Sequence, residues 1–279
     1  MLIQRGASAA AGLALCLAAL TACGGDGGNG GSSAGAAEPP TASGGGDATT
    51  GAAHARQDDA APLRGKVVVL DPGHNGGNAK HPAQINKQVE IGNGRKECDT
   101  TGTSTDDGYP EHAFTWDVSK RLAKILRAEG AKVVLTRPDD TGVGPCITER
   151  AAIGNRAKAD AALSIHADGA SASGHGFHVI QPRSVKGQGD GMVPASRRLG
   201  RAIRDAYRAG TGLPYSTYLG KDGLDSRDDL GGLNLSKVPK VFIECGNMRN
   251  SGDAAKLSSA AFRQRIAEAL AKGLDDYLT

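Results

Sequence analysis

The feature that most constrains the fold is an alternation of short β-branched runs with helical patterns, which begins at Lys66. Residues 66–70 read Lys-Val-Val-Val-Leu, a continuous apolar run that is followed by Asp-Pro-Gly and predicts a buried strand. The alternation predicts a single α/β domain over residues 63–279, with a mostly parallel or mixed twisted sheet and helices on both faces. Strands are expected at 66–70, 131–136, 161–166, 176–181 and 238–244, helices at 110–130, 148–158, 194–209 and from Ser258 or Ser259 onward, and a long loop up to Pro110.

The residues before this pattern have a different composition. The chain of 279 residues contains 41 glycines, and most of the excess falls before Pro62. Residues 23–62 are rich in Gly, Ser, Ala, Pro and Thr, so they cannot bury enough apolar surface to offset chain entropy. We therefore expect a flexible tether, and a coil of about 40 residues has a reach of roughly 35 Å.

The first residues indicate export. Arg5 precedes a largely apolar run over residues 7–19, which is too short for a comfortable bilayer span. Leu-Thr-Ala-Cys follows, ends at Cys23, and resembles the bacterial lipobox, in which the cysteine is lipidated. We expect residues 1–22 to be a lipoprotein signal peptide and the lipid to be the protein's link to the membrane. The alternative is an ordinary secretory signal cleaved near Ala22, and both place the domain outside the cytoplasm.

The net charge and the cysteines indicate which binding partners and which disulfide to expect. A formal net charge of +3 without a basic block argues against nucleic-acid binding, and nothing in the sequence demands a partner subunit, so we expect a monomer. In an oxidising compartment, Cys98 and Cys146 are predicted to form a disulfide because both lie in loop-like sequence. Cys245 follows an apolar strand and is expected to be a buried thiol.

Four polar residues lie where predicted strands end or helices begin. His74 follows the first strand, Glu111 starts a helix, His166 ends the third strand and Glu244 ends the last. In an open α/β sheet, sites form beyond the carboxyl ends of the strands. Two imidazoles and a carboxylate are a common catalytic zinc set, which leaves the second glutamate as a general base.

Each residue also has a plainer explanation. Glu111 in a first turn complements the helix dipole, and a single histidine such as His74 or His166 is more often a loop or strand-end residue than a ligand. Glu244 is harder to explain in this way, because a charge at a buried strand end needs a partner. His178 is the best substitute ligand, although a packed strand histidine is the more common case.

Several motifs then resemble one family. Residues 69–76 read Val-Leu-Asp-Pro-Gly-His-Asn-Gly, residues 164–168 read Ser-Ile-His-Ala-Asp, and Glu111 and Glu244 stand at a helix start and at the last strand. Together with Leu-Thr-Arg at 135–137 and with Arg150 and Asn155, they resemble the zinc N-acetylmuramoyl-L-alanine amidases, over essentially all of residues 65–279. The Asp-Gly-Tyr-Pro-Glu-His and Glu-Cys-Gly-Asn-Met-Arg-Asn stretches are most similar to actinobacterial members.

The resemblance implies a function and roles for the site residues. His74, Glu111 and His166 would hold zinc, and Glu244 would be the catalytic acid/base that cleaves the amide bond between N-acetylmuramic acid and L-alanine in peptidoglycan. Some relatives carry a self-inhibiting helix in a long insert, whereas the corresponding gap here, Pro182–Met192, is short and Gly-rich, so we expect no such helix.

Three questions stay open at this stage. Arg150 is a candidate contact for a substrate carboxylate, and a structural ion pair is at least as good an explanation. The zinc site could instead serve a peptidase or deacetylase that acts on another wall bond. A surface lipoprotein that binds muropeptides without cutting them is the third possibility, and the presence of Glu244 argues against it.

Overall fold

The computed structural model describes residues 61–185 and 190–279. The expected signal peptide 1–22, its lipidation site Cys23 and the tether up to residue 60 lie outside the described residues, as do residues 186–189 of the Pro182–Met192 gap. None of the helices in the described ranges has the length and apolar character needed to cross a bilayer.

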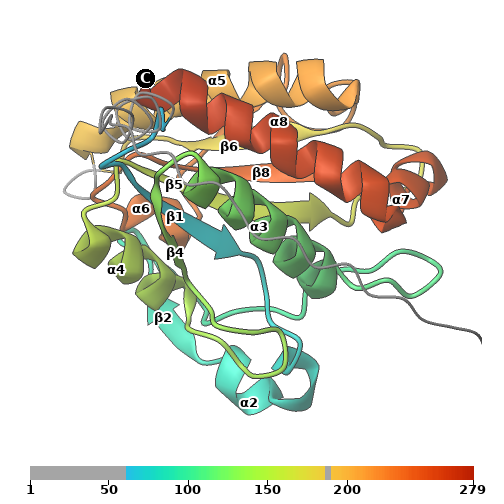
Figure 1. The fold of residues 1–279 in the computed structure, drawn as a ribbon. Helices are drawn as coiled ribbons and strands as arrows, with labels where there is room; N and C mark the ends of the chain where they lie inside the picture. The colour runs from blue at the N-terminus through green and yellow to red at the C-terminus, as the bar shows by residue number, and fades with distance from the viewer. Residues whose placement is uncertain (1–60, 186–189) are drawn as a thin grey trace, which may run out of the picture. The chain divides into compact units, whose positions relative to one another are not determined.

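Six strands form one mixed, mostly parallel sheet (Figure 1). Their order is β4-β1-β5-β8-β6-β7, in which the first four strands are parallel to one another and β6 is antiparallel to β8. β7 is parallel to β6 at the edge. The bounds are Val67–Pro72 (β1), Lys132–Leu135 (β4), Ala161–Asp168 (β5), His178–Pro182 (β6), Leu224–Arg227 (β7) and Lys240–Asn247 (β8). This architecture confirms the predicted α/β class.

Helices cover both faces of the sheet, as predicted (Figure 1). The long helices α3 (Glu111–Ala128), α5 (Val193–Thr211) and α8 (Ala260–Leu278) pack with one face in the main apolar core. α4 (Ile147–Ala157) and the short α6 (Gly231–Asn234) lie on the other face. The remaining elements are the 3-10 turns η1 (Asn78–Lys80) and η2 (Asp190–Met192), α2 (Pro82–Ile85), α7 (Ser251–Ser258), and a separate hairpin of β2 (Gln88–Glu90) and β3 (Arg95–Glu97).

The two faces of the sheet differ in chemistry because side chains alternate along each strand. On β8, Val241, Ile243 and Cys245 point into the main core, whereas Phe242 and Glu244 point to the opposite face. The same alternation on β1, β5 and β6 brings polar side chains to the face that carries Glu244. These are Asp71, Ser164, His166, Asp168 and His178. One face therefore supplies the core, and the other supplies the polar residues of the site.

Some short elements differ from the sequence prediction. The expected loop between residue 71 and Pro110 contains η1, α2, β2 and β3, and β7 was not anticipated. These pieces are only three or four residues long and carry at most two apolar side chains each, so they have no periodic pattern to detect. The last helix begins at Ala260, with Ser259 as its N-cap, and a separate α7 precedes it.

Candidate metal centre

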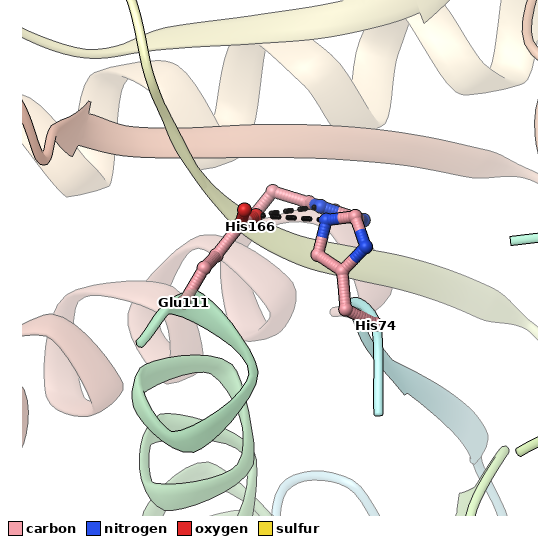
Figure 2. Close-up of side chains that lie close together, drawn as sticks. All are labelled: His74, Glu111 and His166. Atoms are coloured by element: carbon pink, nitrogen blue, oxygen red, sulfur yellow. Dashed lines mark hydrogen bonds and ion pairs between the residues drawn. The ribbon is translucent and has the colours of Figure 1, made fainter. Parts of the chain in front are cut away.

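Three predicted residues meet at the carboxyl ends of the central strands. His74 follows β1, Glu111 is the first residue of α3, and His166 lies near the end of β5. One donor atom from each lies within 4.8 Å of the others. Figure 2 shows the three side chains pointing toward a common point, with Glu111 reaching up from its helix.

The carboxylate of Glu111 is the centre of this group. Its Oε1 lies 3.2 Å from Nε2 of His74 and 3.0 Å from Nδ1 of His166 (Figure 2). Backbone N–H groups of Thr103 and Ala167 donate to its two oxygens, at 3.0 Å and 3.2 Å. Burial opposes the charge on Glu111, but the two histidines outweigh it and lower the pKa of this carboxyl.

Backbone features allow this close approach. His74 has φ 59°, a left-handed conformation that is strained for a non-glycine residue and is found most often at functional sites. A Cβ on Gly73 would stand 2.2 Å from the ring of His166, and one on Gly102 would stand 2.8 Å from His74. Both glycines are therefore required for the rings to lie this close to the backbone.

The donor set fits a divalent metal of the zinc type. Two imidazoles and one carboxylate are a common catalytic zinc set, and tetrahedral bonds of about 2.1 Å place neighbouring donors roughly 3.4 Å apart. The observed separations of 3.2 Å and 3.0 Å are close to this value. Burial lowers the pKa of His74, but the carboxylates of Glu111 and Asp99 more than reverse this and raise it to about 10, so a cation would replace a proton there.

Behind His74 lies a buried ion-pair network. Asp99 Oδ1 is 3.3 Å from Nδ1 of His74, and Asp99 Oδ2 accepts from Arg150 at 3.1 Å. Arg150 also donates to Asp71 and to three backbone carbonyls, those of Pro72, His74 and Pro145, so all five of its N–H groups are engaged within the protein. Of the two explanations of Arg150, this arrangement favours the structural ion pair over the candidate contact with a substrate carboxylate.

Glu244 lies beside the group on the neighbouring strand. It is the cross-strand partner of His166 in the β5–β8 register. Its Oε2 is buried and has no hydrogen-bond partner among the described residues. Burial, together with the nearby Glu111 and Asp168, raises the pKa of Glu244 well above its usual value.

Comparison with known proteins agrees with this geometry. Residues 68–276 match the family Amidase_3, described as N-acetylmuramoyl-L-alanine amidase. The chain is 44% identical over 219 residues to the N-acetylmuramoyl-L-alanine amidase Rv3717 of Mycobacterium tuberculosis, covering 78% of this chain and 88% of that protein. The chain belongs to this amidase family.

Solved structures of mycobacterial amidases have the same fold. The amidase Ami1 of Mycobacterium smegmatis superposes with a TM-score of 0.73 at 42% identity, over 77% of this chain and 98% of that one. The apo form of Ami1 from Mycobacterium abscessus gives a TM-score of 0.72 at 44% identity, over 78% of this chain and all of that one (100%). The expected likeness to actinobacterial members is thereby confirmed.

In this amidase, a cavity of about 220 Å³ opens next to the three residues. His74, Asp99, Arg150 and His166 are among the residues that line it. The apolar side chains of Ile147, Leu230 and Phe242 line it further, and Lys96 and Glu97 of the β2–β3 hairpin also contribute. The cavity gives part of a substrate room beside the candidate metal ligands.

The cysteines of the amidase follow the sequence expectation. Cys98 and Cys146 are joined by a disulfide that ties the segment before Asp99 to the start of α4. Cys245 is a free, buried cysteine that points into the main core, away from Glu244. Burial raises the pKa of its thiol, so Cys245 is not a nucleophile at neutral pH.

Sequence reasoning missed the residues that position the ligands. Asp99, which contacts His74, lies in the segment predicted as loop, and its only signal is its place directly after Cys98. The requirement for Gly73 and Gly102 depends on ring positions that the sequence does not reveal. The substitute ligand, His178, lies on β6 and outside the group of three.

Proposed function

We propose that this peptidoglycan amidase is a zinc enzyme in which His74, Glu111 and His166 hold the metal and Glu244 is the general acid/base. The bond cleaved is the amide between the lactyl group of N-acetylmuramic acid and the nitrogen of L-alanine. The observation that carries the proposal is the convergence of two imidazole nitrogens and one carboxylate oxygen within 4.8 Å, next to a second buried carboxylate on β8.

His74, Glu111 and His166 would hold the zinc, which would lower the pKa of a water to about 7 and polarise the substrate carbonyl. The protein's own residues first fix the positions of the candidate metal ligands. Glu111 is fixed by two backbone N–H groups, and His74 is fixed by Asp99 and Arg150. Ligands held in this way lose little freedom when the substrate arrives.

Glu244 moves the proton. A carboxyl group whose pKa is raised above its usual value accepts a proton from the attacking water more readily, and it can then give that proton to the leaving group. The departing L-alanine nitrogen must be protonated to leave, and Glu244 returns the proton to it. The products are the glycan strand and a free stem peptide with an unblocked L-alanine terminus.

The place of action follows from the N-terminal sequence. Under this proposal, the signal peptide 1–22 directs export, Cys23 carries a lipid at the outer face of the cytoplasmic membrane, and residues 23–62 tether a monomeric domain that reaches the wall. Mass spectrometry of the mature protein tests this part, because the lipidated cysteine would be its first residue. A mature N-terminus after Ala22 without a lipid would support the secreted alternative.

The catalytic assignment is tested with two variants and one control. Glu244→Gln is expected to retain zinc and to release no stem peptide from purified peptidoglycan, whereas His74→Ala is expected to lose both zinc and activity. His81→Leu, at an exposed histidine away from the centre, is the control and should behave as the parent protein. Zinc is measured by elemental analysis and the fragments by mass spectrometry.

Four outcomes would contradict the proposal. Normal turnover by Glu244→Gln would show that Glu244 is not the general acid/base. Undiminished digestion after treatment with a chelator would show that the reaction does not need a metal. Fragments other than stem peptides that begin with free L-alanine would indicate the peptidase or deacetylase alternative. Tight muropeptide binding without any fragment would indicate the non-catalytic alternative.

A further inference from the structure

The strongest unexplained feature is a buried histidine that has no partner. His178 on β6 is fully buried, and neither ring nitrogen has a hydrogen-bond partner among the described residues. Buried polar groups in native proteins are nearly always paired, so such a histidine requires an explanation. It is not one of the three residues of the metal centre.

The sheet register places His178 directly beside Glu244. The two residues are cross-strand partners in the antiparallel β6–β8 pair, so their side chains leave the same face of the sheet. Side chains in such pairs have Cβ atoms about 5 Å apart, which lets an imidazole reach a carboxylate by a change of rotamer. The buried Oε2 of Glu244 is itself without a partner among the described residues.

A tyrosine lies against the imidazole. The ring of Tyr218 packs edge-on to His178, with ring centroids 5.9 Å apart. Ser216 Oγ accepts from the backbone N–H groups of Tyr218 and Leu219, which fixes the turn that carries the tyrosine. A Cβ on Gly174 would stand 2.7 Å from the Tyr218 ring, so only glycine fits there. The chain is thus built to keep His178 covered.

The imidazole is neutral in this setting. Burial lowers the pKa of His178 and Arg227 lowers it further, and the nearby carboxylates of Asp168 and Asp225 do not reverse this. A neutral imidazole carries one N–H donor and one acceptor nitrogen. It can therefore donate to a carboxylate without taking the proton that the reaction needs.

We propose that His178 is a positioning residue for Glu244, donating an imidazole N–H to the buried Oε2 so that Oε1 faces the attacking water. The inference rests on the proposed role of Glu244. Proton transfer takes place on Oε1, and His178 neither gains nor loses a proton. With its Oε2 held, the carboxylate does not rotate away from the water or from the departing nitrogen.

The test separates hydrogen bonding from packing. His178→Leu keeps an apolar side chain of similar size but has no donor, and it is expected to lower kcat about 10- to 100-fold, as is usual for partners of catalytic groups, with KM and zinc content near those of the parent. His178→Asn and His178→Gln restore an N–H and are expected to recover part of kcat. His81→Leu is the matched control.

Each result has a defined meaning. A folded, zinc-bound His178→Leu with the parent's kcat would overturn the inference, as would amide variants no better than leucine. If His178→Leu does not fold, the amide variants still decide the question. Loss of kcat in both His178→Asn and His178→Gln, with normal zinc content and thermal stability, would also overturn the inference. Activity of Glu244→Gln alone would instead contradict the proposed function itself.

Discussion

The candidate centre lies between two groups of buried polar residues that differ in how they are satisfied. The β1 flank consists of Asp71, Asp99 and Arg150, and the β8 flank consists of Glu244, His178 and Tyr218. In the β1 flank, Asp71 accepts from Arg150, Thr136, Ser164 and Lys240 at 2.6–2.9 Å. In the β8 flank, a carboxylate oxygen of Glu244 and both imidazole nitrogens of His178 have no hydrogen-bond partner among the described residues.

We infer from this difference that the β1 flank stabilises the fold and that the β8 flank serves the reaction. Fully paired charges hold His74 and the end of β1 in one arrangement. Unpaired polar groups cost free energy, and proteins retain them mainly where function requires it. We therefore expect changes in the β1 flank to reduce the free energy of unfolding and changes in the β8 flank to reduce turnover.

Breaking the β1 flank should have the largest effect on stability. Arg150→Met removes all five hydrogen bonds and leaves Asp71 and Asp99 buried with less compensation, so we expect a loss of about 3–5 kcal/mol in the free energy of unfolding. Urea unfolding followed by circular dichroism measures it. Arg201→Met, at an exposed position on α5, is the control and should stay within about 0.5 kcal/mol of the parent. A loss of less than about 0.5 kcal/mol for Arg150→Met would show that this hydrogen-bond network does not stabilise the fold.

The disulfide beside the β1 flank should have the next largest effect. Cys98 and Cys146 are 48 residues apart, and replacing both by serine frees this loop in the unfolded chain, at a cost of about 2–4 kcal/mol. Reducing agent should lower the stability of the parent protein by the same amount and leave the double variant unchanged. If reductant destabilised both proteins equally, the effect would not come from this bond.

The same contrast explains how much the sequence predicted. His74, Glu111, His166 and Glu244 were predicted because each stands at the end of a periodic element, and the ends of parallel strands meet at one edge. The positioning groups were not predicted. Asp99 lies in an irregular segment, and the pairing of His178 with Glu244 depends on the register of two strands 58 or more residues apart along the chain.

The fold shows the same limit. Long apolar periodicities predicted the central strands and the three long helices, because burial determines their pattern. The hairpin β2–β3 and the edge strand β7 are stabilised by neighbours that come from distant parts of the chain, such as Asp229, which pairs with Lys96. Arg150 had two explanations in the sequence, and only its five contacts favour the ion pair.

The smallest expected effect on stability has the opposite sign and tests the β8 flank. In zinc-free protein at pH 7, Glu244→Gln should raise the free energy of unfolding by about 0.5–2 kcal/mol, because the parent must bury a charge or take up a proton there. A carboxyl group whose pKa is higher in the folded than in the unfolded protein makes the protein less stable as the pH rises from the unfolded-state pKa toward the folded-state pKa. The advantage of the variant should therefore vanish below about pH 4.5 and grow above it. Unfolding curves from pH 4 to pH 8 measure this difference. A destabilised variant at pH 7 would mean that Glu244 is held by paired contacts like those of Asp71, and the two flanks would then be alike.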